Sequence, residues 1–218
     1  MEAPLHEMTR RDRTRAKNRR EIARAALAVF AQKGYDRASV QEIMDRADFA
    51  VSTFYVLFES KDDLYDKVLA DVARRCGDIF SEAMEGGRDE MDQLMKFARA
   101  KGHIYRKFPE DIRLFNKEIS DQIRGTARQG KASIPEIYDR FMLRIQELFA
   151  SGMKKKIFRQ GDPAVMAASL DSMTTALLQL SIKHPETCVY EDHIEPLLDQ
   201  FFHGVLQSPD ATDSQEGE

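Results

Sequence analysis

The stretch from Ser39 to Lys61 places the strongest constraint on the fold, because it combines two short helical patterns with a tight turn between them. In its second half Phe54 and Phe58 are four residues apart, so the two rings share one helix face and the residues between them point elsewhere. In its first half four apolar residues have the i, i+3, i+4, i+7 spacing of a helix with one buried face: Val40, Ile43, Met44 and Ala47. The stretch therefore predicts a helix-turn-helix.

The outward side chains of the second short helix are polar, aromatic or small. They are Ser52, Thr53, Tyr55 and Val56. A recognition helix needs outward groups of this kind, because it meets phosphates and base edges in a groove of DNA. We therefore interpret the stretch as a DNA-binding helix-turn-helix, with a purely structural helical hairpin as the alternative for an isolated pattern of this kind.

The distribution of charge favours DNA binding more than the sum of charge does. The chain of 218 residues has a formal net charge of −4 at pH 7, which by itself disfavours a nucleic-acid partner. Between Arg10 and Arg46, however, eleven basic and five acidic side chains give a local excess of six positive charges. Arg19 and Arg20 lie on the polar start of the first helix, where we expect them to be free to meet phosphate. A merely solvated charged face is the alternative.

The rest of the chain repeats one pattern, amphipathic helices separated by Gly, Pro or Asp, and shows no strand pattern. Long helices are predicted at residues 14–33, 61 to the Gly86-Gly87 break, 91 to about 108, 112 to about 125, 133–156, 164–183 and 191–206. The predicted fold class is all-α. We place an N-terminal three-helix DNA-binding domain with its basic extension at 1–60, a C-terminal helical domain at 61–206, and a flexible acidic tail at 207–218.

The last two predicted helices are apolar on more than one face. Residues 164–183 spread leucines and methionines around the helix, and residues 191–206 contain adjacent apolar pairs such as Phe201 and Phe202. This is wider than a single intramolecular contact demands. We predict a homodimer in which these two helices form a four-helix interface with two-fold symmetry. Two internal core helices of a monomer would show the same pattern.

Composition argues against several classes of protein. No apolar run approaches the roughly 18 to 20 residues that a membrane span requires, and no apolar signal segment follows the basic N-terminus. Cys76 and Cys188 fit free thiols in a reducing cytoplasm. No set of His, Asp, Glu or Cys has metal-ligand spacing, and no nucleophile–base pair is visible. We therefore expect a cytoplasmic protein that uses no metal, cofactor or membrane and is not an enzyme.

Residues 22–68, IARAALAVFAQKGYDRASVQEIMDRADFAVSTFYVLFESKDDLYDKV, resemble the N-terminal domain of TetR/AcrR-type transcriptional regulators. The first helix, the Gly-Tyr turn, the helix-turn-helix and the Phe-x-x-Lys start of the fourth helix follow in the family's order and spacing. The resemblance implies that Ser39, Thr53, Tyr55 and Lys61 position the protein on DNA phosphates. It also implies that the C-terminal helices form a ligand-binding and dimerisation domain.

The chain departs from the family's pattern at three places. Asp48 replaces the usual turn glycine, Ala50 replaces the usual serine cap of the recognition helix, and residues 56–57 replace a pair that is commonly His and Tyr. We expect the turn to form, because Asp tolerates the left-handed backbone conformation better than most residues. Base choice then falls to Val51 and Ser52, through apolar contact with thymine methyl groups or mostly through DNA shape.

By the same resemblance, helices four to eight enclose a cavity for a small-molecule effector. Ten methionines and thirteen phenylalanines indicate a plastic, aromatic interior that tolerates varied apolar ligands. Polar groups that would orient a ligand are His103, Tyr138, Asn116 and Gln122. Plain core packing is the alternative for the apolar candidates, and a surface or internally bonded position for the polar ones. The pocket candidates are Phe80, Met84, Met95, His103, Phe115, Ile119, Tyr138, Phe141, Ile145, Phe149, Met173 and Leu177.

Together these features predict a homodimeric repressor whose recognition helices enter successive major grooves of a double-stranded, pseudo-palindromic operator, with half-sites about 34 to 36 Å apart. A small, largely apolar effector would favour a different separation and so release the DNA, with the motion carried by the helix from Lys61 to Met84. The alternatives are an effector-independent DNA-binding factor of the same fold, and an enzyme or other ligand binder that borrows the scaffold.

Overall fold

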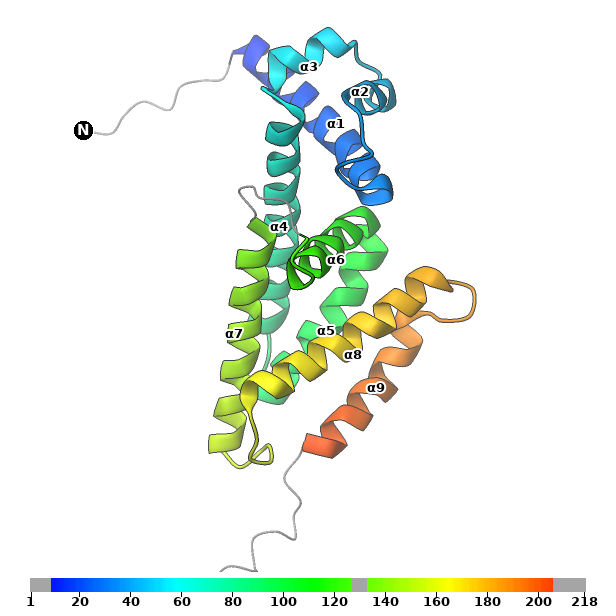
Figure 1. The fold of residues 1–218 in the computed structure, drawn as a ribbon. Helices are drawn as coiled ribbons and strands as arrows, with labels where there is room; N and C mark the ends of the chain where they lie inside the picture. Colours follow the sequence, from blue (N-terminus) through cyan, green and yellow to red (C-terminus); the bar gives the residue numbers. More distant parts are fainter. Residues whose placement is uncertain (1–8, 127–132, 206–218) are drawn as a thin grey trace, which may run out of the picture. The chain divides into compact units, whose positions relative to one another are not determined.

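The computed structural model describes residues 9–126 and 133–205, and throughout these two ranges the regular structure is helical, without a β-strand (Figure 1). The all-α fold class predicted from the sequence is confirmed. The predicted acidic tail at 207–218 lies outside the described residues. The helices are α1 Arg10–Lys33, α2 Val40–Ala47, α3 Val51–Leu57, α4 Lys61–Glu85, α5 Glu90–Lys107, α6 Pro109–Ile123, α7 Ser133–Lys154, α8 Pro163–Lys183 and α9 Tyr190–Val205.

The chain divides into two compact units. Unit 1 consists of residues 1–74 and 113–134, and unit 2 of residues 75–112 and 135–218. Because the division falls inside α4, α6 and α7, the units follow packing and not helix ends. The domain limits expected from the sequence, 1–60 and 61–206, stay a prediction.

Helix α1 begins four residues earlier than the sequence patterns predicted. Thr9 and Asp12 form a capping box, in which the Asp12 N–H donates to Thr9 Oγ1 and the Thr9 N–H donates to Asp12 Oδ2, each at 3.2 Å. The hydrogen bonds from Thr9 also hold the pKa of the Asp12 carboxyl below its usual value. The cap lets the basic residues from Arg10 onward continue as one helix, which ends at Gly34 with a φ of 77° that suits glycine.

The core of unit 1 forms where α1, α2, α3 and the start of α4 present apolar faces to one another. Ile22, Phe30, Ile43 and Phe54 are completely buried. Phe30 also meets Tyr65 of α4 edge-on, with 4.7 Å between ring centroids. This packing fixes the two short helices, which are too short to be stable alone in water.

Unit 2 has an aromatic core and a buried ionic cluster. The Phe80 ring lies 5.0 Å from the Phe97 ring and 5.2 Å from the Phe141 ring, centroid to centroid. Lys101 of α5 is buried against Asp171 of α8, with 2.5 Å between Nζ and Oδ1. Helices α5, α8 and α9 pack on one another around this pair.

Helix α8 is more apolar than we expected from the sequence. By length and composition it is the one helix of the described residues that is able to cross a membrane, with a mean hydropathy of 1.2 over its apolar window. The expectation that no segment approaches a membrane span was therefore too strict. A single such helix is weak evidence of a span, because core helices pass the same test. Asp171, near its middle, is ion-paired inside unit 2.

Candidate nucleic-acid interface and effector groove

The helix-turn-helix of α2 and α3 has the geometry predicted from the sequence. Ser39 caps α2, because its hydroxyl accepts a hydrogen bond from the Glu42 N–H at 3.1 Å. Asp48 ends α2 in the left-handed conformation, with φ 59° and ψ 44°, so aspartate does take the place of the usual turn glycine. Ala50 precedes α3 at the N-cap position and offers no side-chain hydrogen bond to it. The turn therefore depends on backbone conformation and on packing beneath α3.

Helix α3 separates its buried and exposed residues as the spacing indicated. Phe54 and Phe58 are buried with their rings 5.5 Å apart, and Leu57 is buried beside them. Tyr55 is 66% exposed and Val56 is 65% exposed, so two large side chains stand next to each other on the outward face. Of the other candidates, Ser52 is exposed and Val51 and Thr53 are half-buried. The outward face is thus ready for contact with a partner.

Val56 was expected to point outward from this helix but was not among the predicted DNA-binding residues. The structure exposes it beside Tyr55. The Tyr55 ring meets the Phe54 ring edge-on at 5.2 Å, which fixes the orientation of the phenol. The signal that identifies Val56 is its position off the i, i+4 face shared by Phe54 and Phe58. An exposed valine offers apolar contact of the kind that a thymine methyl group accepts.

Lys61, at the start of α4, is already bonded inside unit 1. Its ammonium donates to the carbonyl oxygens of Tyr35 at 3.0 Å and Ala38 at 2.9 Å, and it lies 4.1 Å from the centroid of the Tyr35 ring. Lysine has three N–H donors, so one remains for a phosphate. Lys61 therefore fixes the loop between α1 and α2 as well as offering a positive charge near the cap of α2.

Arg19 differs from its expected role. Its guanidinium donates from Nε and Nη2 to the carbonyl oxygen of Leu57, at 3.1 and 2.7 Å. Arg15, one turn earlier, donates from Nη2 to the Val56 carbonyl at 2.8 Å. Two of the five N–H donors of Arg19 therefore serve the C-terminal end of α3, and the contact of Arg19 with phosphate stays a prediction. Arg20 is exposed, and its contact with phosphate stays a prediction.

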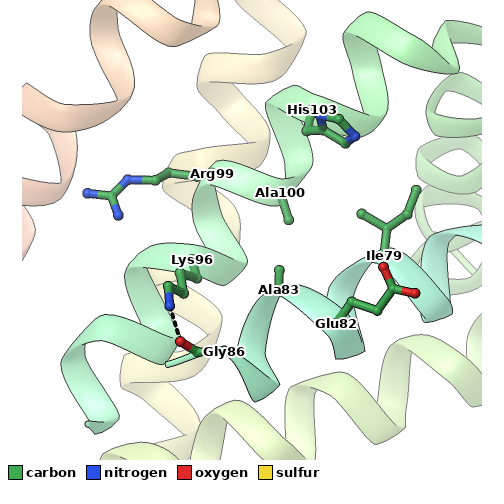
Figure 2. A pocket seen from close by; sticks show the side chains of 8 residues that line it. All are labelled: Ile79, Glu82, Ala83, Gly86, Lys96, Arg99, Ala100 and His103. Atoms are coloured by element: carbon green, nitrogen blue, oxygen red, sulfur yellow. Dashed lines mark hydrogen bonds between the residues drawn. The ribbon is translucent and has the colours of Figure 1, made fainter. Parts of the chain in front are cut away.

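A groove in unit 2 lies between the last turns of α4 and the middle of α5 (Figure 2). It has a volume of about 430 Å³. Its floor is formed by small and apolar side chains, and Figure 2 shows Ala83 and Ala100 opposite each other across it. The residues that line it are Ile79, Glu82, Ala83, Gly86, Lys96, Arg99, Ala100 and His103.

The cations at the rim of the groove already have partners. The Lys96 ammonium donates to the Gly86 carbonyl oxygen, which Figure 2 draws as a dashed line. Arg99 forms a two-pronged ion pair with Glu195 of α9, at 2.6 and 2.8 Å, and its guanidinium points away from the floor. This pairing holds the pKa of the Glu195 carboxyl below its usual value. A ligand in the groove would meet mainly the apolar floor, His103 and Glu82.

The groove includes only His103 from the predicted effector pocket. In unit 2, Phe80, Met84, Ile145, Phe149 and Leu177 are buried in the core, and Met95, Tyr138, Phe141 and Met173 are half-buried. Phe115, Ile119, Asn116 and Gln122 belong to unit 1. An effector pocket lined by the predicted set stays a prediction. The sequence did not predict the groove residues, because the groove is marked by the small residues Ala83, Gly86 and Ala100. The predicted pocket was based on stripes of large apolar side chains.

The buried ionic cluster of unit 2 explains one predicted polar residue. Tyr138 donates from its hydroxyl to Asp171 Oδ2 at 2.9 Å. Lys101 Nζ donates to Asp171 Oδ1 at 2.5 Å and to the hydroxyls of Thr174 and Thr175 at 2.8 and 2.9 Å. Burial lowers the pKa of Lys101, whereas Asp171 acts in the opposite direction. Tyr138 is thus internally bonded, which was one of the alternatives for it.

Comparison with known proteins identifies the N-terminal region. Residues 22–68 match the family model described as bacterial regulatory proteins, tetR family. The uncharacterized HTH-type transcriptional regulator YvdT of Bacillus subtilis is 32% identical over 69 residues, which are 32% of this chain and 36% of YvdT. The HTH-type transcriptional regulator LuxR of Vibrio harveyi is 30% identical over 84 residues, 37% of this chain and 41% of LuxR. The chain thus spans less than half the length of these curated relatives.

The fold of most of the chain also has solved counterparts. A TetR transcriptional regulator from Chloroflexus aurantiacus superposes with a TM-score of 0.74 at 17% identity, covering 90% of this chain and all of that one. At this identity the likeness concerns the fold. The sequence match lies on the capped helices, the turn at Asp48 and the exposed face of α3 described above. The N-terminal region, residues 22–68, is therefore similar to the tetR family of bacterial regulatory proteins.

Proposed function

We propose that the protein is a DNA-binding transcriptional regulator that acts as a homodimeric repressor on a pseudo-palindromic operator and is released by a small, largely apolar molecule. The observation that carries this proposal is the outward face of α3. Ser52, Tyr55 and Val56 are exposed on a helix that is held from beneath by Phe54 and Phe58. A surface with these groups has hydroxyls for phosphates and an apolar contact for bases.

The role of each group on this surface follows from its chemistry. The hydroxyls of Ser39, Thr53 and Tyr55 suit phosphate oxygens, which fix the register of the protein on the duplex without reading sequence. Val56, and the half-buried Val51, suit the methyl group of thymine. We therefore propose that sequence preference is concentrated at T·A steps, with the shape of the duplex contributing at other positions.

An exposed face of apolar and small side chains on α8 supports dimerisation through α8 and α9. Val165 and Leu180 are 61% and 52% exposed, and the small residues Ala168, Ser172 and Ala176 are exposed between them. Small side chains along one face allow a second helix to approach closely. A two-fold dimer would place two copies of α3 on half-sites about 34 to 36 Å apart. Sedimentation at micromolar concentration tests this, because a monomer there contradicts the proposal.

Release by an effector is proposed to act through α4. This single helix carries Lys61 in its first turn and Ile79, Ala83 and the neighbouring groove residues in its last turns. A ligand that favours one position of the last turns would also favour one position of Lys61, and DNA affinity would change by the same coupling free energy. The apolar floor of the groove suits a small apolar molecule.

An effector-independent factor remains the second candidate, and one observation favours it. Side chains fill the interior where a cavity was predicted, since Phe80 contacts the rings of both Phe97 and Phe141. A screen of small apolar compounds by thermal shift separates the two. A compound that raises the melting temperature and weakens DNA binding supports release by a ligand, and the absence of any such compound supports the second candidate.

Selection from a random duplex library tests the DNA-binding proposal. Full-length protein at about 0.15 M salt is incubated with random 40-base-pair duplexes, and the bound fraction is amplified and sequenced. The proposal predicts a two-fold related motif whose half-site centres lie about 10 base pairs, or a multiple of this, apart. Bound DNA without any enriched motif contradicts the proposal.

A further inference from the structure

The C-terminal end of α3 has an unusual set of partners. A helix leaves its last carbonyl groups without partners inside the helix, and α3 has only seven residues from which to draw stability. Its last internal link is the hydrogen bond from the Phe58 N–H to the Phe54 carbonyl at 2.8 Å. The carbonyls of Val56 and Leu57 therefore depend on donors from elsewhere in the chain.

Two arginines of α1 supply these donors. Arg15 donates to the Val56 carbonyl at 2.8 Å, and Arg19 donates twice to the Leu57 carbonyl, at 3.1 and 2.7 Å. Arg15 and Arg19 are one turn apart, on the same side of α1 as the buried Ile22. Positive charge is favourable at this end of a helix, where the carbonyl groups leave partial negative charge. We call Arg15 and Arg19 the arginine brace.

The brace also reaches the residue that follows α3. The Arg19 guanidinium carbon lies 5.8 Å from the centroid of the Phe58 ring, and Lys67 Nζ lies 5.5 Å from the same centroid. Phe58 is buried and anchors the chain between α3 and α4. Arg19 thus contacts both the last carbonyl of α3 and the first anchor beyond it, so a movement of α3 would break contacts on both sides.

We propose that Arg15 and Arg19 are positioning residues, which fix the angle of α3 on α1 and thereby the orientation in which Val56 meets base edges and Tyr55 meets phosphate. This inference rests on the proposed function. It assigns the two arginines to sequence preference, because the N–H groups described above hold the carbonyl oxygens of Val56 and Leu57 at the end of α3. Val56 is affected most directly, since Arg15 holds its carbonyl while its side chain is exposed.

Arginine-to-lysine substitutions test the brace, because lysine keeps the positive charge but lacks the rigid fork that donates twice to one oxygen. Arg19→Lys and Arg15→Lys are compared with the wild type on the DNA motif obtained by selection. Arg24→Lys, an exposed position further along α1, is the matched control. Arg20→Gln serves as the comparison for a phosphate contact, whose loss lowers the slope of log affinity against log salt by about 1.

The brace predicts that Arg19→Lys lowers the ratio of specific to non-specific DNA affinity by about tenfold, with the salt slope unchanged. Arg15→Lys should lower the same ratio by a smaller factor, because one hydrogen bond is involved instead of two. Both variants should behave as Arg24→Lys does in thermal unfolding, within a few degrees. Arg19→Gln, which removes the charge, is measured beside Arg20→Gln. An equal reduction of the salt slope in these two variants, or an unchanged specificity ratio in Arg19→Lys, would overturn the proposal.

Hydrogen exchange separates failure of the brace from failure of the proposed function. Exchange of the backbone amides of α3 is measured in free protein, without DNA. Faster exchange in Arg19→Lys than in Arg24→Lys supports the brace, whichever ligand the protein binds. Equal exchange in the two variants overturns it, even where wild-type protein selects a DNA motif. Wild-type protein that selects no motif overturns only the DNA-binding function.

Discussion

Among the buried polar side chains of unit 2, Lys101 should be the one whose truncation lowers the free energy of unfolding most. Lys101 Nζ has four oxygen atoms within hydrogen-bond distance, namely the carboxylate and carbonyl of Asp171 and the hydroxyls of Thr174 and Thr175, at 2.5 to 3.0 Å. Only the charged amine has three donors to share among them. In Lys101→Met the Asp171 carboxylate stays buried, with the Tyr138 hydroxyl as its remaining donor.

The expected loss in the free energy of unfolding is about 3 to 5 kcal/mol, which is typical for leaving one partner of a buried ion pair alone. Lys101→Met combined with Asp171→Leu should lose less than Lys101→Met alone, because no charge is then buried without a partner. Thr174 keeps its own bond to the Leu170 carbonyl at 2.8 Å in both variants. The comparison therefore isolates the charge.

Urea unfolding followed by circular dichroism measures these values, at one fixed protein concentration because dimerisation contributes to stability. Lys183→Met is the control, since Lys183 is an exposed lysine on α8, and it should change stability by less than about 0.5 kcal/mol. A loss below about 1 kcal/mol in Lys101→Met would refute the reasoning, and so would a double variant that is less stable than the single one.

Three further outcomes follow from the structure. Val56→Ala should lower the affinity for the selected DNA by about threefold to tenfold in binding assays. Replacing thymine by uracil in that DNA should lower the affinity of the wild type by a similar factor but leave the affinity of the variant unchanged. Hydrogen bonds from Lys155 and Ser151 lower the pKa of Glu90 to about 2. The ionised Glu90 should therefore stabilise the fold by about 1 to 2 kcal/mol above the unfolded pKa near 4.5, and this stabilisation should be lost as pH falls towards 2. Acid unfolding of Glu90→Gln should lack this pH dependence. Gly102→Ala should cost about 1 to 3 kcal/mol, because its Cβ would lie 2.4 Å from Tyr190 Cδ1, and equal melting temperatures would contradict this.

The parts of the fold that the sequence predicted are those determined by nearby residues. The faces of α2 and α3 follow from spacings of three and four residues, and the left-handed turn at Asp48 follows from the residue type. The start of α1 was also readable, since Thr9 and Asp12 have the spacing of a capping box, but the run of basic residues after it was interpreted as an extension. Local sequence patterns were sufficient wherever residues within one helical turn determine the structure.

The parts that escaped prediction depend on partners far along the chain. Arg19 meets a carbonyl 38 residues away, and no pattern in the sequence marks a backbone oxygen as an acceptor. Lys101 and Asp171 are 70 residues apart, and each alone looks like an ordinary surface charge. The groove of unit 2 arises where Ala83 and Ala100 are too small to fill the space between two helices, which only the packing of α4 on α5 reveals.

The central claim is that the exposed face of α3 reads a DNA sequence, and the ratio of two dissociation constants tests it most directly. One is measured for the duplex obtained by selection and the other for a scrambled duplex of equal length and composition, both with full-length wild-type protein at 0.15 M salt. The account predicts a ratio of about a thousand or more in favour of the selected duplex. A ratio near one would contradict it.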